Sequence, residues 1–183
     1  MGATRTLLPE GAIRRAIAVS TFVSVGNATQ PFPRLLDAVA NMAAELPQPV
    51  TVQYGNSAFS CTACRSVDFV AMDSFMKHMQ EADLLILHAG AGAIISAMQV
   101  GKVPVVVPRK AEYGEHIDNH QLEFARSLAA TNRVVVVEDL SRLLAAVEEA
   151  RLLQARRPPR VGAPALVSTI EQVLAGYAAD AGG

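Results

Sequence analysis

The five residues from His88 to Gly92 read His-Ala-Gly-Ala-Gly, a pattern that can bind phosphate. They stand between an apolar run and a segment with helical spacing, which predicts a turn from a strand into a helix. Glycine has no Cβ, so Gly90 and Gly92 would let the backbone approach a ligand, and free amides at the helix start, including that of Ala91, would donate to an anion. His88 would add a further donor. The alternative is a tight turn whose glycines serve only packing.

Two further polar loops are expected at the same edge of a sheet. The loop over 112–121, Glu-Tyr-Gly-Glu-His-Ile-Asp-Asn-His-Gln, runs into a predicted helix, and Asn119 and Gln121 could contact sugar hydroxyls. The alternative is that Asp118 and Gln121 form a near capping box, which would satisfy the helix amides without a ligand. The loop over 26–30, Gly-Asn-Ala-Thr-Gln, leaves the first predicted strand.

Several other chemistries lack their motifs. The chain has neither a Gly-x-Ser-x-Gly elbow nor a phosphate-loop lysine, and the carboxylates of the 112–121 loop have no spacing that indicates a glycosidase. A dinucleotide fingerprint would need a third glycine or alanine where Ile95 stands, which makes NAD the weaker interpretation. Cys61 and Cys64 form half of a zinc motif, so reduced thiols are expected and no metal is predicted.

Composition favours one globular domain. The chain has 183 residues, 51% hydrophobic and 18% charged, with a formal net charge of -1, which gives no electrostatic case for binding nucleic acid. No apolar run reaches the roughly 20 residues that a membrane-spanning helix needs. We predict one domain over 1–183, with a core from about 16 to 153, a Pro- and Arg-rich linker over 154–165 and a last helix over about 166–177.

Apolar runs alternate with amphipathic stretches, which predicts an α/β fold with a doubly wound, mostly parallel sheet. Continuous apolar strands imply that both faces of the sheet are covered, and ligands are expected at the carboxyl ends of the strands. The predicted strands are 16–25, 50–55, 68–72, 83–88, 103–108 and 133–138, and the predicted helices are 32–46, 74–82, 93–100, 119–130 and 140–153. Pro33 fits a first helical turn, and Gly101 fits a helix carboxyl end.

The segment over 83–109, followed by Asp-Asn-His-Gln-Leu-Glu-Phe-Ala over 118–125, resembles the C-terminal, nucleotide-sugar-binding half of family 28 glycosyltransferases, the group that includes MurG. It is similar above all to stand-alone halves, namely the PssE-type subunits of exopolysaccharide synthesis and the catalytic subunit that adds the second GlcNAc to dolichol diphosphate. The segments over 23–39 and 52–59 resemble the start and the second strand of such subunits. The resemblance covers residues 18–147.

The resemblance implies roles for individual residues. His88, Gly90 and Gly92 match the diphosphate loop, and Gly26 and Asn27 match the first-strand loop beside it. Asn119 and Gln121 match the segment that faces the donor sugar. Two positions depart from the family pattern: Ser96 replaces a Glu that commonly holds the ribose, and Asn27 replaces Thr or Ser. Arg109 and Lys110 could pair with a carboxylate on the sugar, although two solvated surface charges are the plainer interpretation.

The implied protein is the donor-binding half of a GT-B glycosyltransferase, a Rossmann-like domain that takes a UDP-sugar. We expect an inverting hexosyl transfer without cofactor or protein-bound metal, in which His88 and the loop amides stabilise the diphosphate. A membrane-anchored partner subunit would hold a lipid-linked acceptor and supply the general base. The chain would then lie on the cytoplasmic face of the membrane through that partner. The alternatives are a UDP-sugar-binding scaffold without activity and an NAD-binding protein.

Overall fold

Six parallel strands form the central sheet of the structure, a computed structural model that describes residues 20–156 and, for His120, only the backbone. Their order is β3-β2-β1-β4-β5-β6, so the chain winds outward from β1 in one direction and from β4 in the other. The predicted doubly wound parallel sheet is therefore confirmed. The strands are β1 (Thr21–Ser24), β2 (Val50–Gln53), β3 (Cys64–Val67), β4 (Leu84–His88), β5 (Val105–Val107) and β6 (Val135–Val136).

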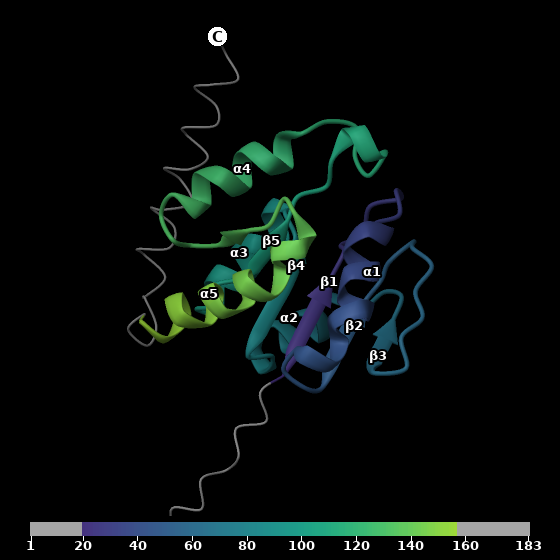
Figure 1. Cartoon of the computed structure of the whole chain (residues 1–183), viewed down its shortest axis with the longest axis horizontal. Coiled ribbons are helices and arrows are strands. Elements are labelled where there is room, and N and C mark those ends of the chain that lie inside the picture. Colours follow the sequence, from purple (N-terminus) through teal and green to yellow (C-terminus); the bar gives the residue numbers. More distant parts are fainter. Residues whose placement is uncertain (1–19, 157–183) are drawn as a thin grey trace, which may run out of the picture.

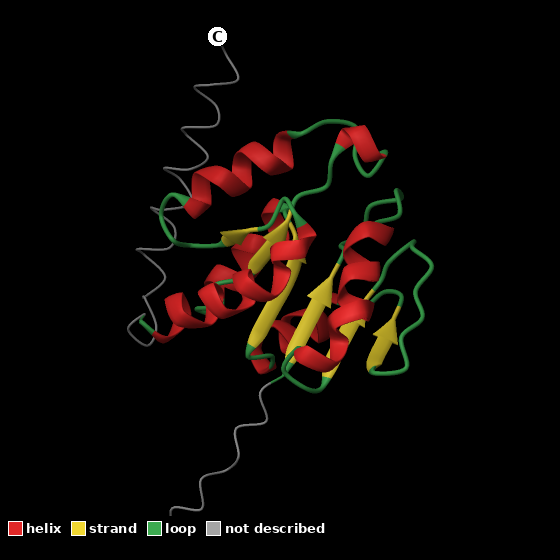
Figure 2. Cartoon of the chain, in the orientation of Figure 1, coloured by secondary structure: helices red, strands yellow, loops and turns green. Residues whose placement is uncertain are grey.

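Helices cover both faces of this sheet, as its continuous apolar strands require. Within residues 20–156, the first and last helices pack on one face, and the three between them pack on the other (Figure 1). Figure 2 shows the strands side by side between these two helical layers. The helices are α1 (Pro33–Met42), α2 (Met72–Glu81), α3 (Ala91–Gln99), α4 (His120–Ala129) and α5 (Leu143–Ala155), with short 3-10 helices η1 (Ala43–Glu45), η2 (Ala111–Tyr113) and η3 (Leu140–Arg142).

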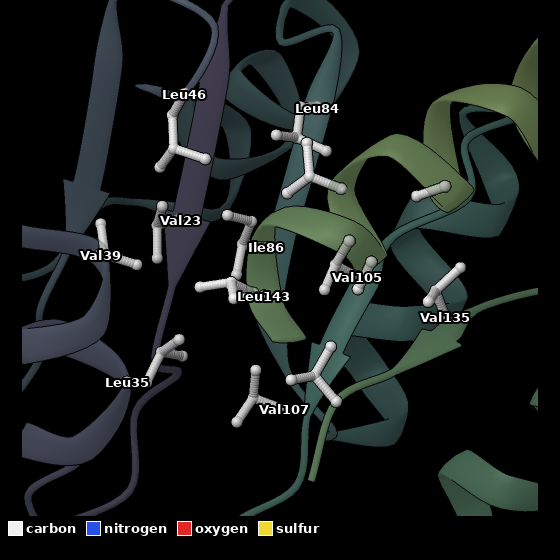
Figure 3. Packing of buried hydrophobic residues seen from close by; sticks show 14 of the residues in the cluster. Val23, Leu35, Val39, Leu46, Leu84, Ile86, Val105, Val107, Val135 and Leu143 are labelled. Atoms are coloured by element: carbon white, nitrogen blue, oxygen red, sulfur yellow. The ribbon is translucent and has the colours of Figure 1, made fainter. Parts of the chain in front are cut away.

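Alternate residues of each central strand enter different cores, because side chains along a strand point to opposite faces. On β1, Val23 packs beneath α1 and α5, whereas Phe22 packs toward α2 and α3. Figure 3 shows Val23 beside Ile86 and Val105 on neighbouring strands. These side chains belong to the core that α1 and α5 cover. This double burial fixes the register of β1 against its neighbours and so places the loop that follows it.

Local signals set several boundaries where the sequence predicts them. Pro33 is the first residue of α1, where its fixed φ and missing N–H carry no penalty. Gly101 follows α3 with a φ of +78°, a left-handed conformation that favours glycine. α3 begins at Ala91 rather than at residue 93, so the glycine pattern itself forms the first turn of the helix.

The third predicted strand is wrong. Residues 68–71 form the connection into α2 instead, Met72 is the first residue of that helix, and Phe69 and Met72 are exposed. The strand is the preceding polar segment β3, which pairs only with β2 at the edge of the sheet and exposes Arg65 and Ser66. An edge strand needs little apolar surface, so hydrophobicity alone points to the wrong segment.

Parts of three predictions lie outside the described residues: residues 16–19 of the first strand, most of the linker over 154–165 and the last helix over 166–177. Within residues 20–156, none of the helices combines the length and the apolar character that a membrane crossing requires.

Candidate nucleotide-sugar site

A cavity of about 420 Å³ opens at the carboxyl ends of β1 and β4. These two strands are neighbours at the centre of the sheet, where the direction of winding reverses, and open α/β sheets bind their ligands at this point. The predicted edge of the sheet therefore carries a cavity. The cavity is lined by Ser24, Gly26, Asn27, Gln53, Val70, Met72, Phe75, His88, Gly90, Gly92, Ala93 and Ser96.

His88, the last residue of β4, lies between two glycines. A Cβ added to Gly90 would stand 2.2 Å from its Nε2 atom, and one added to Gly26 would stand 2.4 Å from its Cε1 atom. Real Cβ atoms never approach other atoms this closely, so both positions need glycine while the imidazole keeps its place. Gly26 also has a φ of +78°. Gly26 and Gly90 therefore serve first to accommodate His88.

The surroundings of His88 keep its imidazole neutral. Burial, followed by the positive charge of Arg109, lowers the pKa of His88 from 6.5 to about 4. The backbone of Ser24 opposes this change only in part, and Nδ1 is buried without a hydrogen-bond partner among the described residues. A second ring proton would have no acceptor there, in agreement with the low pKa. His88 can thus offer a ligand a neutral hydrogen bond, without a positive charge.

The amino end of α3 meets the cavity with free backbone amides. Gly90 is the residue before the helix, and no side chain caps the first turn. In contrast to Gly90, a Cβ on Gly92 would meet no atom within 4 Å, so no contact within the described chain requires glycine there. Open space beside uncapped amides leaves room for an anion to approach the helix start.

Ser96 lies one turn further along α3 and also lines the cavity. Its hydroxyl donates to the carbonyl oxygen of Gly92 at 2.8 Å. This bond within the helix occupies the only hydroxyl proton, so Ser96 keeps only lone pairs for a ligand.

Two cavity residues, Ser24 and Gln53, escaped the sequence analysis. Both are buried and polar at the carboxyl ends of their strands, and the Ser24 hydroxyl donates to Gln53 Oε1 at 2.7 Å. Gln53 Nε2 in turn donates to Asn27 Oδ1 at 3.2 Å. A polar residue at the carboxyl end of a buried strand was the signal that could have revealed them.

Arg109 is not a solvated surface charge, and it does not line the cavity. Its side chain is 1% exposed and lies over the ring of Phe32, with its Cζ atom 4.6 Å from the ring centre. Its guanidinium donates to the carbonyl oxygens of Val25, Gln30 and Glu115 at 2.8, 2.9 and 3.0 Å. Arg109 therefore ties the loop after β1 to the loop after β5.

Glu115 strengthens the same connection, which the sequence analysis also missed. Its buried carboxylate receives two hydrogen bonds from Arg34 at 2.8 and 2.9 Å and one from the Lys110 backbone at 3.0 Å. Arg34 belongs to the first turn of α1, so the ion pair joins that helix to the loop after β5. The Lys110 side chain, half-buried rather than freely solvated, lies 3.4 Å from Glu112.

Asn119 and Gln121 lie at the start of α4, outside the cavity lining. Asn119 Oδ1 accepts from the Ala111 backbone at 3.1 Å, and Gln121 Oε1 accepts from the Arg109 backbone at 3.3 Å. The residue before α4 is Asn119, which makes no side-chain cap, and Asp118 Oδ1 lies 3.1 Å from His116 Nδ1. A second half of a ligand site at this loop remains a prediction.

Cys61 and Cys64 are free thiols, and burial together with the neighbouring Cys61 thiol raises the pKa of Cys64 to about 12. Among residues 20–156, no three His, Cys, Asp or Glu side chains gather as metal ligands.

Comparison with known sequences identifies related proteins. The family description "Glycosyltransferase family 28 C-terminal domain" matches residues 20–168. The UDP-N-acetylglucosamine transferase subunit ALG13 of Yarrowia lipolytica is 37% identical over 71 residues, a match that covers 39% of this chain and 34% of the relative. The chain therefore matches about a third of the length of that relative.

Solved structures share the fold at lower sequence identity. The glycosyltransferase of kitacinnamycin has a TM-score of 0.62 at 19% identity, and the match covers 88% of this chain and 40% of that one. The solution structure of ALG13 has a TM-score of 0.57 at 17% identity, and the match covers 80% of this chain and 92% of that one.

Proposed function

Because this chain belongs to the glycosyltransferase family 28 C-terminal domain family, whose model matches residues 20–168, we propose that it is the donor-binding catalytic subunit of a glycosyltransferase that uses a UDP-sugar. The observation that carries this proposal is the cavity at the centre of the sheet, where uncapped amides of α3 and a neutral His88 face open space at Gly92. A diphosphate is an anion that such neutral donors suit.

In the proposed reaction, an acceptor hydroxyl attacks the anomeric carbon with inversion. The bond from this carbon to the diphosphate oxygen breaks, and its electron pair leaves with UDP. His88 and the amides of Ala91 and Gly92 stabilise the charge that grows on the diphosphate, and each well-placed donor is worth about 3 kcal/mol. No side chain that lines the cavity within the described chain suits the role of general base, because the low pKa of His88 makes its imidazole a weak proton acceptor. The hydroxyl proton therefore passes to a base on a partner.

A membrane-anchored partner that holds a lipid-linked acceptor completes the proposal. Its support is the sequence match to an ALG13 relative that is described as a transferase subunit. The natural context that we propose is exopolysaccharide or glycolipid synthesis at the cytoplasmic side of a membrane.

Calorimetric titration with UDP tests the donor site. We expect the wild-type protein to bind UDP and Gly92→Ala to bind it at least tenfold more weakly, because the new methyl group would stand where the diphosphate approaches the amides. Ser127→Ala is the matched control, since Ser127 is exposed on α4, away from the cavity lining. Failure of the wild type to bind UDP, or binding of NAD alone, would refute the proposal.

A scaffold subunit without activity is the second candidate, favoured by one observation. Ser96 donates its hydroxyl proton to the carbonyl oxygen of Gly92 and cannot replace a carboxylate that holds two ribose hydroxyls. Sugar transfer after reconstitution with the membrane partner separates the two: transfer supports the enzyme, whereas UDP binding without transfer supports the scaffold.

The third alternative, NAD, agrees less well with the topology. The dinucleotide glycines belong to the turn after the first strand of the fold, whereas here the paired glycines follow β4.

A further inference from the structure

Ser24 and Gln53 are two buried polar side chains in a sheet whose other central residues are mostly apolar. They are 0% and 2% exposed, and they are directly paired in the register of β1 and β2. Two apolar residues would fill these places without the cost of burying a hydroxyl and an amide, which must then be hydrogen-bonded. The contacts that they make therefore require an explanation beyond packing.

The hydrogen bonds of these residues form a chain that begins at a backbone amide. The Gly26 amide donates to Ser24 Oγ at 3.2 Å, and a backbone amide can only donate. The Ser24 hydroxyl donates in turn to Gln53 Oε1 at 2.7 Å. The other end of the Gln53 amide, Nε2, is thereby fixed as a donor toward Asn27, 3.2 Å from its Oδ1.

This order of donors and acceptors sets the orientation of the Asn27 amide. Because Oδ1 faces Gln53, the NH₂ group becomes the end available to the cavity that Asn27 lines. The reverse orientation would place an oxygen there, which would repel an anionic ligand and would set two NH₂ groups against each other at Gln53. The two orientations thus differ in the chemistry that they offer to a ligand.

We propose that Gln53 is a positioning residue that turns the Asn27 amide so that its NH₂ group donates to an anionic oxygen of the bound diphosphate. This inference rests on the proposed function, because it takes the diphosphate of a UDP-sugar as the ligand. Gln53 also lines the cavity, but it is only 2% exposed whereas Asn27 is exposed, so the proposed route to the ligand is through Asn27.

A double-mutant cycle with UDP as the probe tests this role. Gln53→Met keeps the length of the side chain and removes both of its hydrogen bonds, whereas Asn27→Ala removes the group that is positioned. We expect Gln53→Met to weaken UDP binding by about tenfold in the wild-type background and by less than twofold in the Asn27→Ala background. An equal loss in both backgrounds would show a general structural effect and overturn the proposal.

Nuclear magnetic resonance of the free protein gives a second readout. The side-chain NH₂ resonances of Asn27, assigned by their disappearance in Asn27→Ala, report the hydrogen bond to its Oδ1 without any ligand. We expect Gln53→Met to shift them and Ser127→Ala to leave them in place. Unchanged resonances in Gln53→Met would overturn the positioning contact even if UDP failed to bind, an outcome that by itself would refute only the proposed function.

Discussion

Replacement of His88 by Asn should remove a pH dependence from the stability of the protein. The pKa of His88 falls from 6.5 to about 4 on folding, first through burial and then through the charge of Arg109. Above about pH 7 the ring is neutral in both the folded and the unfolded chain, and it adds no dependence. Below pH 6.5 the unfolded chain takes up a proton that the folded chain refuses, so the free energy of unfolding decreases as the pH falls toward 4.

The magnitude follows from the two pKa values. A tenfold change in proton affinity is worth about 1.4 kcal/mol, so full titration of His88 corresponds to about 3 kcal/mol. The free energy of unfolding of the wild type should therefore be lower than at pH 8 by about 1 kcal/mol at pH 6 and by about 2 kcal/mol at pH 5. Below pH 4 the difference should level off, because both states are then protonated.

Urea unfolding of the wild type and of His88→Asn at pH 8, 7, 6 and 5 measures this directly. Other titrating groups contribute equally to both proteins, so the difference between their unfolding free energies isolates His88. His88→Asn will be less stable at pH 8, because it leaves space between Gly26 and Gly90, and the gap should narrow by about 2 kcal/mol at pH 5. A gap that stays constant within 0.5 kcal/mol, taken as about the precision of such measurements, would refute a buried, neutral His88.

Three further outcomes follow from the same contacts. Gly90→Ala should lower the unfolding free energy by about 2 kcal/mol through its clash with His88, and urea unfolding of the double variant with His88→Ala should recover most of that loss. Ser96→Glu should tighten UDP binding severalfold in calorimetry by supplying a carboxylate to the ribose, whereas Ser127→Glu, the same charge change outside the cavity lining, should not. Arg109→Lys should lower the unfolding free energy by about 3 kcal/mol, because a single ammonium cannot reach the carbonyls that the planar guanidinium joins.

The sequence predicted the architecture because its signals are local. Apolar periodicity located five of the six strands, and the pattern His-Ala-Gly-Ala-Gly indicated the turn at the centre of the sheet. The polar edge strand β3 was missed, since an edge position is a property of the whole sheet and leaves little trace in the segment itself.

The environment of Arg109 could not be predicted from its neighbours in the sequence. Its burial depends on the carbonyl of Val25, which lies 84 positions away along the chain, and on Phe32 from the start of α1. From the sequence alone, a charged residue just after a strand is predicted to be exposed to solvent, because its distant partners are not known. The roles of the two glycines could not be predicted from the sequence pattern either. Gly90 accommodates His88, whereas no contact within the described chain requires glycine at position 92.

Under the proposed function, these contacts explain how the cavity would bind an anion without a cation. Among the described residues, no Lys, Arg, Asp or Glu lines it, and His88 is held neutral. The nearby arginines are committed elsewhere, Arg109 to backbone carbonyls and Arg34 to Glu115, and they keep the surrounding loops in place. Stabilisation of a diphosphate then depends on neutral donors whose directions are fixed before the ligand arrives. Such donors need no reorganisation as charge develops on a leaving diphosphate, which is the condition under which hydrogen bonds contribute most to a transition state.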